Sequence, residues 1–222
     1  MRILSKSGVC SRKQAADVVK QGRVKVNGKI ISDPGFKISI RDKVLLDGRP
    51  LQKKIKKYYI FNKPAGCVTT RDDELGRETV YKYLEGVSEW VFPVGRLDKD
   101  SEGLLLFTND TAFGDFLTDP KNLVERTYEV LVGGEVSGEE LEKIRAGIDI
   151  GRGEKTQPVY VKYLSKQENG ALLRMTLTEG KNREIRRIFE SLGKEVVRLK
   201  RLQFGKYRLG ELKPGEWREV QK

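Results

Sequence analysis

A short charged loop near the middle of the chain contains the residue types needed for carboxylate chemistry. Residues 95–98 read GRLD, and the apolar run LLLF at 104–107 then predicts a buried strand. A polar loop fixed to a rigid strand is a common way to hold a reactive group at a cleft. Four acids in and after this loop are equal candidates by composition, with a solvated turn as the alternative, and they show no recognised metal-ligand pattern: Asp98, Asp100, Glu102 and Asp110.

Two later segments supply an aromatic ring and a cluster of cations. In ERTYEV, residues 125–130, alternation places Tyr128 on one face of a strand, with a half-buried core tyrosine as the alternative interpretation. The segment EGKNREIRRIF, residues 179–189, predicts a flexible turn followed by an amphipathic helix, and the free amides of that turn suit a phosphate. We also expect phosphate contacts from three arginines on another face of the helix, with a solvated face as the alternative: Arg183, Arg186 and Arg187.

The chain contains no histidine, which removes several common mechanisms. Ser-His-Asp and Cys-His catalysis, histidine-ligated zinc and histidine proton shuttles are excluded. The two cysteines, Cys10 and Cys67, lack metal-ligand spacing and fit reduced thiols in a cytoplasmic protein. The N-terminus lacks the apolar stretch of a signal peptide, and no apolar run approaches the length that a bilayer requires. The chemistry therefore depends on Asp, Glu, Tyr, Lys, Arg, Ser or Thr.

The excess positive charge is confined to the first quarter of the chain. Residues 1–57 contain 16 Lys and Arg against four Asp, a net of +12, which equals the formal charge of the whole chain. A solvated surface usually mixes both signs, so this asymmetry predicts a polyanionic partner. We expect nucleic acid rather than a membrane, because no amphipathic anchor with bulky apolar residues accompanies the charge. Residues 174–208 form a second basic stretch, with 11 basic and four acidic residues.

The elements of the first module are predicted to be one helix and a small sheet. SRKQ at 11–14 has the form of a capping box, and Gly22 is a natural end for the helix. Residues 23–26 alternate charged and apolar side chains before the tight-turn pair Asn-Gly at 27–28, and Asp-Gly at 47–48 repeats that signal. We expect a basic surface made of Arg12, Lys13, Arg23 and Lys25.

A lysine-rich connector at 53–57 marks the expected boundary between a domain of residues 1–57 and one of residues 58–222. Beyond it, strands and helices alternate without the regular rhythm of a parallel βαβ fold. SGEE at 137–140 is a second capping box, and residues 159–164 and 171–177 predict two strands joined across an Asn-Gly pair. These signals predict an α+β fold with a mixed, mostly antiparallel sheet after the small αβ module.

The first 50 residues resemble the S-four-like RNA-binding domain, which is named after a ribosomal protein. The likeness is carried by SKSGVCSRKQAADVVKQGRVKVNGK, above all by its serine-arginine helix start and by GRVKVNG. The resemblance implies that this module binds RNA. A basic module of the same shape that does not bind RNA is the alternative.

The whole chain resembles the ribosomal pseudouridine synthases, which modify single uridines of small- or large-subunit RNA. KYYIFNKPAGCVTT, VGRLDKDSEGLLLFTND, ERTYEV and EGKNREIRRIF occur in the order of that family's motifs. The resemblance implies that Asp98 is the catalytic aspartate, Tyr128 the active-site tyrosine, and Arg186 the basic residue that pairs with the aspartate. For Lys63 a structural role is the alternative to a substrate contact. We expect further RNA or substrate contacts from Lys63, Arg96, Lys181, Arg183 and Arg187.

The implied reaction breaks the N-glycosidic bond of uridine and rejoins the same uracil through carbon. It is an isomerisation, so we expect no cofactor and no metal. A carboxylate can trap positive character on the sugar or remove a proton from it, and the sequence leaves both routes open. Arginine at position 186 favours the branch of this family that modifies large-subunit RNA. A small-subunit target and a non-catalytic assembly factor are the alternatives. We expect a monomer whose partner is ribosomal RNA, free or in an assembling subunit.

Overall fold

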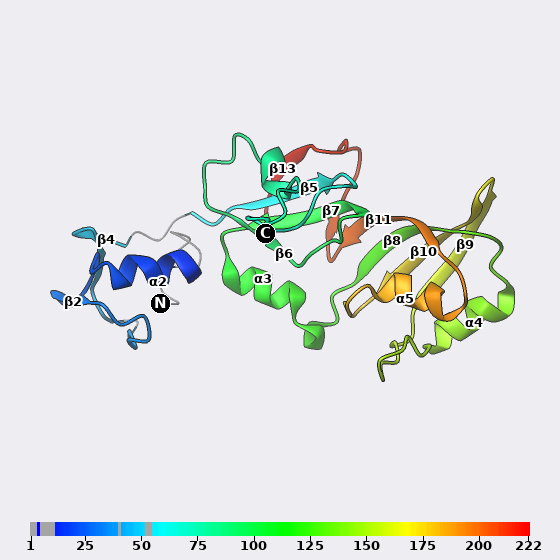
Figure 1. Ribbon diagram of the computed structural model, residues 1–222, viewed down its shortest axis with the longest axis horizontal. Coiled ribbons are helices and arrows are strands. Elements are labelled where there is room, and N and C mark those ends of the chain that lie inside the picture. The colour runs from blue at the N-terminus through cyan, green and yellow to red at the C-terminus, as the bar shows by residue number, and fades with distance from the viewer. Residues whose placement is uncertain (1–3, 5–11, 40, 52–54) are drawn as a thin grey trace.

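The computed structural model describes residues 4, 12–39, 41–51 and 55–222, and Figure 1 shows a small N-terminal module beside a larger domain. Among the described residues, the first contains a four-stranded sheet and the second a nine-stranded sheet. Each sheet packs on its own hydrophobic clusters. The prediction of an α+β fold with a mostly antiparallel sheet is confirmed.

The N-terminal module packs one helix against a short antiparallel sheet. α2 (Arg12–Lys20) buries its apolar face, including Val19, against this sheet. The predicted Asn-Gly turn is confirmed, because Asn27 and Gly28 have φ values of 50° and 85°, as a two-residue hairpin turn of this kind requires. The predicted helix cap at Ser11 lies outside the described residues. The strands follow the order β2-β1-β3-β4 and are β1 (Val24–Val26), β2 (Lys29–Ile31), β3 (Val44–Leu46) and β4 (Arg49–Pro50).

The larger domain is built on a mixed sheet. Its strands follow the order β13-β5-β7-β11-β8-β10-β9, with β12 paired to β11 and β6 to β7. The pairing of β7 with β11 is parallel and the other pairings are antiparallel. The strands are β5 (Tyr58–Lys63), β6 (Phe92–Val94), β7 (Ser101–Thr108), β8 (Arg126–Val132), β9 (Tyr160–Gln167), β10 (Gly170–Leu177), β11 (Val196–Phe204), β12 (Tyr207–Arg208) and β13 (Trp217–Val220).

β7 is the strand at which the sheet divides. One of its edges pairs with β5, and the other edge is shared by two strands, with β11 at residues 101–103 and β6 at residues 106–108. Gly103 lies opposite Arg201 in the parallel pair, and a Cβ at this glycine would lie 2.3 Å from the backbone oxygen of Arg201. Only glycine therefore allows β11 to approach β7 at this point. The loop from β6 to β7, residues 95–100, lies beside this division.

Helices cover parts of the sheet. α4 (Gly138–Ala146) begins with the predicted capping box, in which the N–H of Glu140 donates to the Ser137 hydroxyl at 3.2 Å and the Glu140 carboxylate accepts from the N–H of Ser137 at 2.7 Å. α5 (Glu184–Ser191) packs its apolar face into the same core as α4. No helix in the described ranges is long and apolar enough to cross a bilayer. Further helices in the described part of the chain are α3 (Thr111–Thr118) and the short 3₁₀ helices η1 (Val80–Tyr83) and η2 (Pro120–Asn122).

Candidate active site

The loop that carries Asp98 is held by contacts on both sides of this residue. Gly95 turns the chain with a φ of 74°, and the side chain of Leu97 is buried in the core beneath the loop. The Thr69 hydroxyl donates to the Leu97 carbonyl at 2.7 Å and accepts from the Leu97 N–H at 3.3 Å. The N–H of Ser101 donates to the Asp98 carbonyl at 3.1 Å. The loop is therefore rigid, and the Asp98 carboxylate, 40% exposed, faces the cleft.

Lys63 lies beneath this loop, and the expectation that it contacts RNA is wrong. Its side chain is fully buried, and Nζ donates to the carbonyls of Ser101 at 2.7 Å, Pro64 at 3.0 Å and Lys99 at 3.1 Å. Burial lowers the pKa of Lys63 because it disfavours the charged form. The structural alternative fits instead: the ammonium group ties the end of β5 to the loop on the C-terminal side of Asp98.

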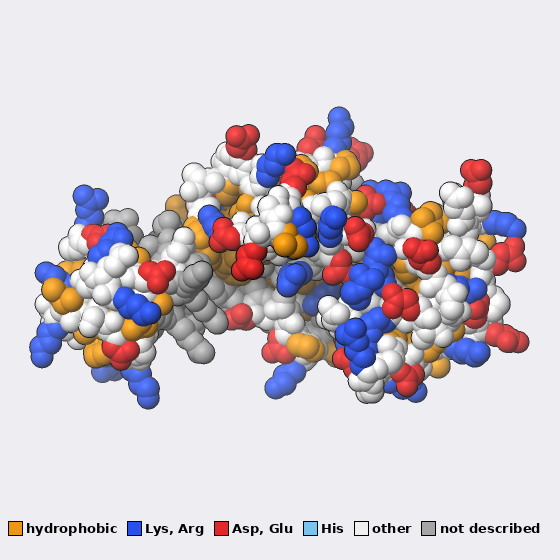
Figure 2. Space-filling model, in the orientation of Figure 1, with side chains coloured by type: hydrophobic (Ala, Val, Ile, Leu, Met, Phe, Trp, Pro, Cys, Tyr) orange, Lys and Arg blue, Asp and Glu red, His pale blue; other side chains and the backbone are white. Residues whose placement is uncertain are grey.

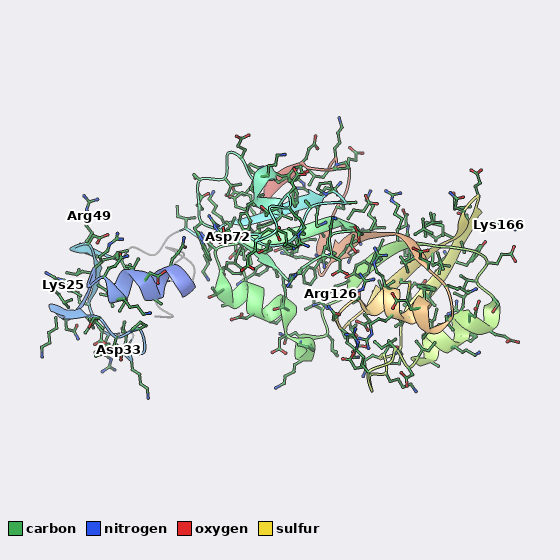
Figure 3. The ribbon with its side chains drawn as sticks, in the orientation of Figure 1. Lys25, Asp33, Arg49, Asp72, Arg126 and Lys166 are labelled. Atoms are coloured by element: carbon green, nitrogen blue, oxygen red, sulfur yellow. The ribbon has the colours of Figure 1, made fainter. Side chains whose placement is uncertain are left out.

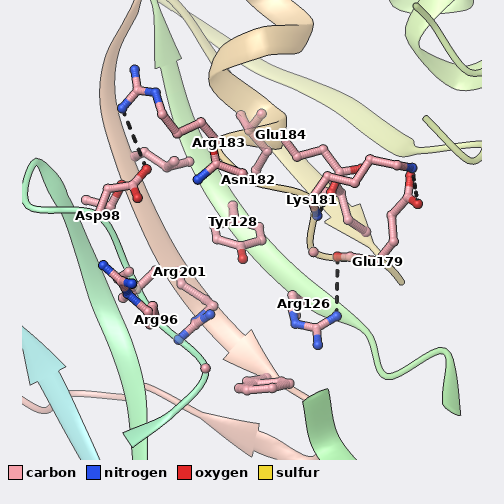
Figure 4. Close-up of a pocket in the computed structure, with 18 of the residues that line it drawn as sticks. Arg96, Asp98, Arg126, Tyr128, Glu179, Lys181, Asn182, Arg183, Glu184 and Arg201 are labelled. Atoms are coloured by element: carbon pink, nitrogen blue, oxygen red, sulfur yellow. Dashed lines mark hydrogen bonds and ion pairs between the residues drawn. The ribbon is translucent and has the colours of Figure 1, made fainter. Parts of the chain in front are cut away.

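A cleft of about 490 Å³ lies between the Asp98 loop and the turn before α5 (Figure 4). Tyr128 of β8 forms part of its wall and packs against the clusters on both sides. In the sheet register Tyr128 lies opposite Met175 on one side and Arg201 on the other. Cross-strand neighbours share one face of a sheet, so Tyr128 and Arg201 enter the same cleft. Tyr128 is thus both a packed tyrosine and an aromatic wall of the site.

Arg183, rather than the predicted Arg186, forms the ion pair with Asp98. Its Nη1 lies 3.7 Å from Asp98 Oδ2. Arg186 instead donates to the carbonyl of Val196 at 2.9 Å and to the carbonyl of Asp100 at 3.3 Å, so the predicted pairing of Arg186 with the catalytic candidate is wrong. Arg183 precedes α5 in the left-handed conformation, with a φ of 50°, which directs it toward the loop. Arg186 lies one turn later and faces the start of β11.

Arg187 is buried, and its expected contact with RNA phosphate is wrong. Its side chain is 7% exposed, and Nη1 lies 2.5 Å from the Glu154 carboxylate. The same guanidinium donates to the carbonyls of Ile150 at 3.0 Å and Gly151 at 2.7 Å. These contacts tie α5 to the loop after α4. Helical spacing groups Arg187 with Arg183 and Arg186 on the surface of α5. It does not reveal that the loop after α4 covers the side of the helix on which Arg187 lies.

Three charged side chains tie the turn that leads into α5. The ammonium group of Lys181 pairs with Glu179 and donates to the Lys155 carbonyl at 3.0 Å. The N–H of Lys181 donates to Glu184 Oε2 at 2.9 Å, so this amide does not receive the phosphate expected at the turn. Burial, followed by the hydrogen bond with Glu179, raises the pKa of Glu184 to about 8. Within the described part of the chain, no group of three or more Cys, Asp or Glu side chains is placed to hold a metal ion.

Two buried arginines in the cleft were not anticipated from the sequence. Arg126 and Arg201 are 8% and 3% exposed, and both line the cleft. Their guanidinium carbons lie 4.7 and 5.0 Å from the centre of the Phe204 ring. A signal for Arg126 exists in the alternation that places it on the same face as Tyr128, two residues away. The sequence holds no comparable signal for Arg201, whose strand contains two register shifts.

Exposed cations lie at the rim of the cleft and on the N-terminal module. Arg96 is exposed and lines the cleft, and Figure 2 shows Lys and Arg side chains gathered over the start of α5. Lys25 is exposed on β1 between two buried valines, as predicted, and projects from the small sheet in Figure 3. Arg23 is also exposed, but it forms two hydrogen bonds, of 2.8 and 2.6 Å, with the Asp47 carboxylate, which offsets its charge. The side chains of Arg12 and Lys13 lie outside the described part, and their contact with RNA stays a prediction.

Comparisons with known proteins match both parts of the chain. The model of the RNA pseudouridylate synthase family matches residues 57–191, and that of the S4 domain matches residues 1–44. The chain is 36% identical to a Bacillus subtilis protein named ribosomal large subunit pseudouridine synthase B, over 99% of this chain and 90% of that protein. It is also 36% identical to an uncharacterized RNA pseudouridine synthase of Aquifex aeolicus, over 99% of this chain and 88% of that protein.

Solved structures have the same fold. A crystal structure of a pseudouridylate synthase matches with a TM-score of 0.71 and 29% identity, over 99% of this chain and 94% of that one. A chain of the archaeal box H/ACA Nop10–Cbf5 complex matches with a TM-score of 0.53 and 18% identity, over 70% of this chain and 50% of that one, which is a likeness of fold alone. Together with the sequence matches, the first structure confirms both resemblances inferred from the motifs.

Proposed function

We propose the function of this chain on the basis that it belongs to the RNA pseudouridylate synthase family. The proposed reaction is the isomerisation of one uridine of ribosomal RNA to pseudouridine, with Asp98 as the catalytic carboxylate. The position of Asp98 carries the proposal: it stands on a braced loop at a cleft, with Tyr128 in the wall and Arg183 at 3.7 Å. The name of the Bacillus subtilis relative favours large-subunit RNA as the substrate.

Asp98 meets the requirements of the reaction. Cleavage of the bond between C1′ and N1 develops positive character on the sugar, and an ionised carboxylate beside C1′ stabilises or traps it. Removal of a proton from C2′ by the same carboxylate is the other route, and the geometry of Asp98 suits both. Arg183 places a positive charge 3.7 Å from the carboxylate and helps to orient it toward the cleft.

Tyr128 and Arg186 take different roles in this proposal. The ring of Tyr128 offers a flat surface on which the uracil stacks, and its hydroxyl lies within the cleft, where the carbon that forms the new bond loses its proton. Arg186 acts as a positioning residue, because it joins α5 to the Asp100 carbonyl in the loop and to the start of β11. It therefore supports Asp98 through the backbone of the loop.

RNA reaches the site by two basic surfaces. The target base must leave its RNA helix, and its unstacking and unpairing cost roughly a few kcal/mol. Phosphate contacts from exposed cations offset that cost. We assign these contacts to Arg96 and Arg183 at the rim of the cleft and to the N-terminal module, including Lys25. We place the boundary between the two domains at residue 57, after the lysine-rich connector.

Replacement of Asp98 by asparagine tests the proposal. Asp98→Asn keeps the size of the side chain and removes its charge, so we expect turnover to be lost while RNA binding survives. The assay is tritium release from C5 of uridine in transcribed large-subunit RNA, together with filter binding of the same RNA. Asp100→Asn is the matched control, because Asp100 lies two residues after Asp98 and its carboxylate is exposed. Asp100 contacts Arg186 through its backbone carbonyl, which the substitution leaves in place.

The outcome distinguishes the alternatives. Full activity of Asp98→Asn contradicts the assignment of this residue. Absence of tritium release by the unchanged protein on both ribosomal RNAs favours a non-catalytic assembly factor. Release from small-subunit RNA alone moves the target to that subunit. Mapping of pseudouridines in ribosomal RNA from cells that lack the protein then identifies the uridine.

A further inference from the structure

Two cations in the cleft lack the carboxylate partners that buried charges normally have. Arg201 and Arg126 are nine-tenths buried or more, and neither makes an ion pair with another described residue. Burial lowers the pKa of Arg126, and the neighbouring positive charge of Arg201 acts in the same direction. Unpaired buried charges are costly and are retained in proteins chiefly where they serve a purpose. Because both arginines line the cleft, we expect their charge to act on a molecule that enters it.

The two guanidinium groups differ in how many donors they have left. Arg126 donates to several backbone carbonyls, including that of Leu117 at 3.0 Å and that of Val124 at 3.1 Å. Arg201 donates from Nε to the Leu104 carbonyl at 2.7 Å, and its buried Nη2 meets no acceptor among the described residues. A guanidinium has five N–H donors, so Arg201 keeps donors for a ligand. Arg126 adds positive charge beside it.

The depth of Arg201 selects the part of the nucleotide that it meets. A flipped nucleotide enters a site base first, so its phosphates stay at the rim. The exposed cations Arg96 and Arg183 lie at that rim, whereas Arg201 is 3% exposed. Tyr128 lies directly opposite Arg201 in the sheet register, and in Figure 4 its hydroxyl points toward Arg126 and Arg201. A uracil stacked on Tyr128 would present its carbonyl edge within the part of the cleft that these guanidinium groups line.

The proposed reaction creates negative charge on this edge. When the bond between C1′ and N1 breaks, its electron pair passes to N1 and spreads over O2 and O4 of the uracil, while Asp98 bonds to C1′ or removes the C2′ proton. C5 then bonds to C1′, Asp98 is released or the C2′ proton is returned, C5 loses its proton, and N1 gains one. Uridine and pseudouridine are isomers, so no other reactant is needed. Fixed cations that meet charge only as it develops lower the barrier without tightening substrate binding.

We infer that Arg201 is a further catalytic residue, whose guanidinium group stabilises the uracil anion released on cleavage, with Arg126 strengthening the same field. This inference rests on the proposed function. It assigns opposite electrostatic tasks to the two ends of one cleft. Asp98 stabilises positive charge on the sugar, and Arg201 stabilises negative charge on the base.

Arg201→Met tests the inference, because methionine keeps an unbranched apolar stem over Phe204 and removes the charge. The single-turnover rate of tritium release from the large-subunit transcript, measured with enzyme in excess, is expected to fall about 10²- to 10³-fold, as for the loss of one oxyanion donor. The dissociation constant for RNA is expected to change less than about threefold, because the phosphate contacts at the rim remain. Arg201→Lys keeps the charge at a shifted position and is expected to recover part of the rate.

A second measurement separates contact with the base from a structural effect. A synthetic RNA that carries the mapped uridine is prepared with sulfur in place of O2 or O4, since sulfur accepts hydrogen bonds poorly. If Arg201 bonds one of these oxygens, the corresponding substitution slows the unchanged enzyme and has little further effect on Arg201→Met. A sulfur in the phosphate is expected to slow both enzymes equally. Arg201→Lys enters the same comparison if the methionine variant does not fold.

Arg198→Met is the matched control, since Arg198 lies on the same strand, is half exposed and pairs with Glu102 outside the cleft. Its rate is expected to equal that of the unchanged enzyme. An active, folded Arg201→Met variant overturns the inference. So does a slow variant in which both base substitutions retain their full effect. If the unchanged protein releases no tritium at all, the proposed function itself fails, and this result is distinct from the other two.

Discussion

The buried ammonium group of Lys63 offers a quantitative test of how the Asp98 loop is held. Lys63→Met replaces the side chain by an uncharged one of similar length. Three backbone carbonyls, those of Pro64, Lys99 and Ser101, then lose a donor that lies 2.7 to 3.1 Å away. The Lys99 carbonyl keeps one other donor, the N–H of Gly66 at 2.8 Å. Because the side chain is fully buried, water does not replace these bonds without rearrangement of the loop.

The expected loss of stability follows from these contacts, and Lys99 contributes least because its carbonyl keeps the Gly66 donor. A buried acceptor left without a partner costs about 1–3 kcal/mol. Removal of the ammonium group also removes the cost of burying its charge, which offsets part of the loss. We therefore expect a net destabilisation of about 3 kcal/mol, within the range seen when one partner of a buried polar group is deleted. For a chain of this size that corresponds to a fall in Tm of about 6–12 °C.

The pH dependence has a definite sign. The pKa of Lys63 is lowered in the folded protein, so between that value and the ordinary lysine value the unfolded chain binds more protons than the folded one. Stability from this group therefore rises with pH through that window, because the cost of the buried charge is relieved. The methionine variant lacks this gain. The difference in Tm between the two proteins is expected to widen from pH 7 toward pH 10.

Differential scanning calorimetry at several pH values measures both effects. Lys99→Met is the control, since this lysine lies on the same loop with an exposed side chain, and its Tm is expected to stay within about 2 °C of the original value. The single-turnover rate of Lys63→Met is expected to fall while RNA binding persists, because the loop loses its support beside Asp98. A Lys63→Met variant with unchanged Tm and unchanged rate refutes the reasoning.

Two further predictions concern backbone approach and a buried acid. Gly103→Ala places a Cβ 2.3 Å from the Arg201 carbonyl oxygen, so we expect a loss of more than about 3 kcal/mol in chemical denaturation, against a smaller loss for Gly66→Ala, whose Cβ meets open space at a similar positive φ. Glu184 has its pKa raised to about 8, so its protonated form contributes stability that is lost as the pH rises from the ordinary carboxyl value toward 8. Glu184→Gln is therefore expected to be the more stable protein at pH 8 and to lose that advantage at pH 4.5; an equal Tm at both values contradicts the assignment.

Local signals predicted much of the fold because they act within a few residues. The Asn27-Gly28 turn follows from the left-handed backbone that these residues tolerate, and the start of α4 follows from a capping box four residues long. The alternation around Tyr128 correctly placed it on an inward face of β8. Asp98 was one acid among four by composition, and the family motif singled it out. The structure adds the reason for its rigidity, in the contacts of Thr69 and Lys63.

Charge partners were predicted less well because they join distant parts of the chain. Arg186 and Arg187 carry the same charge as Arg183, and helical spacing does not reveal what covers each side of the helix. In the structure, one of them bonds backbone carbonyls, the second meets Glu154, and only Arg183 reaches Asp98. For Lys63 the family motif left both substrate contact and a structural role open, and in the structure its three N–H groups are used within the protein.

The sequence by itself determined the local elements, the basic N-terminal module and the candidate carboxylate. Tertiary structure alone decided the environment of that carboxylate, because the cleft forms where β6 and β11 diverge along β7. That arrangement depends on the contact of Gly103 with the backbone of Arg201, nearly a hundred residues away. Residue spacing sets which side chains share a face of one element. The packing of elements sets which charges meet, and it placed Arg201 beside Tyr128 in the same cleft as Asp98.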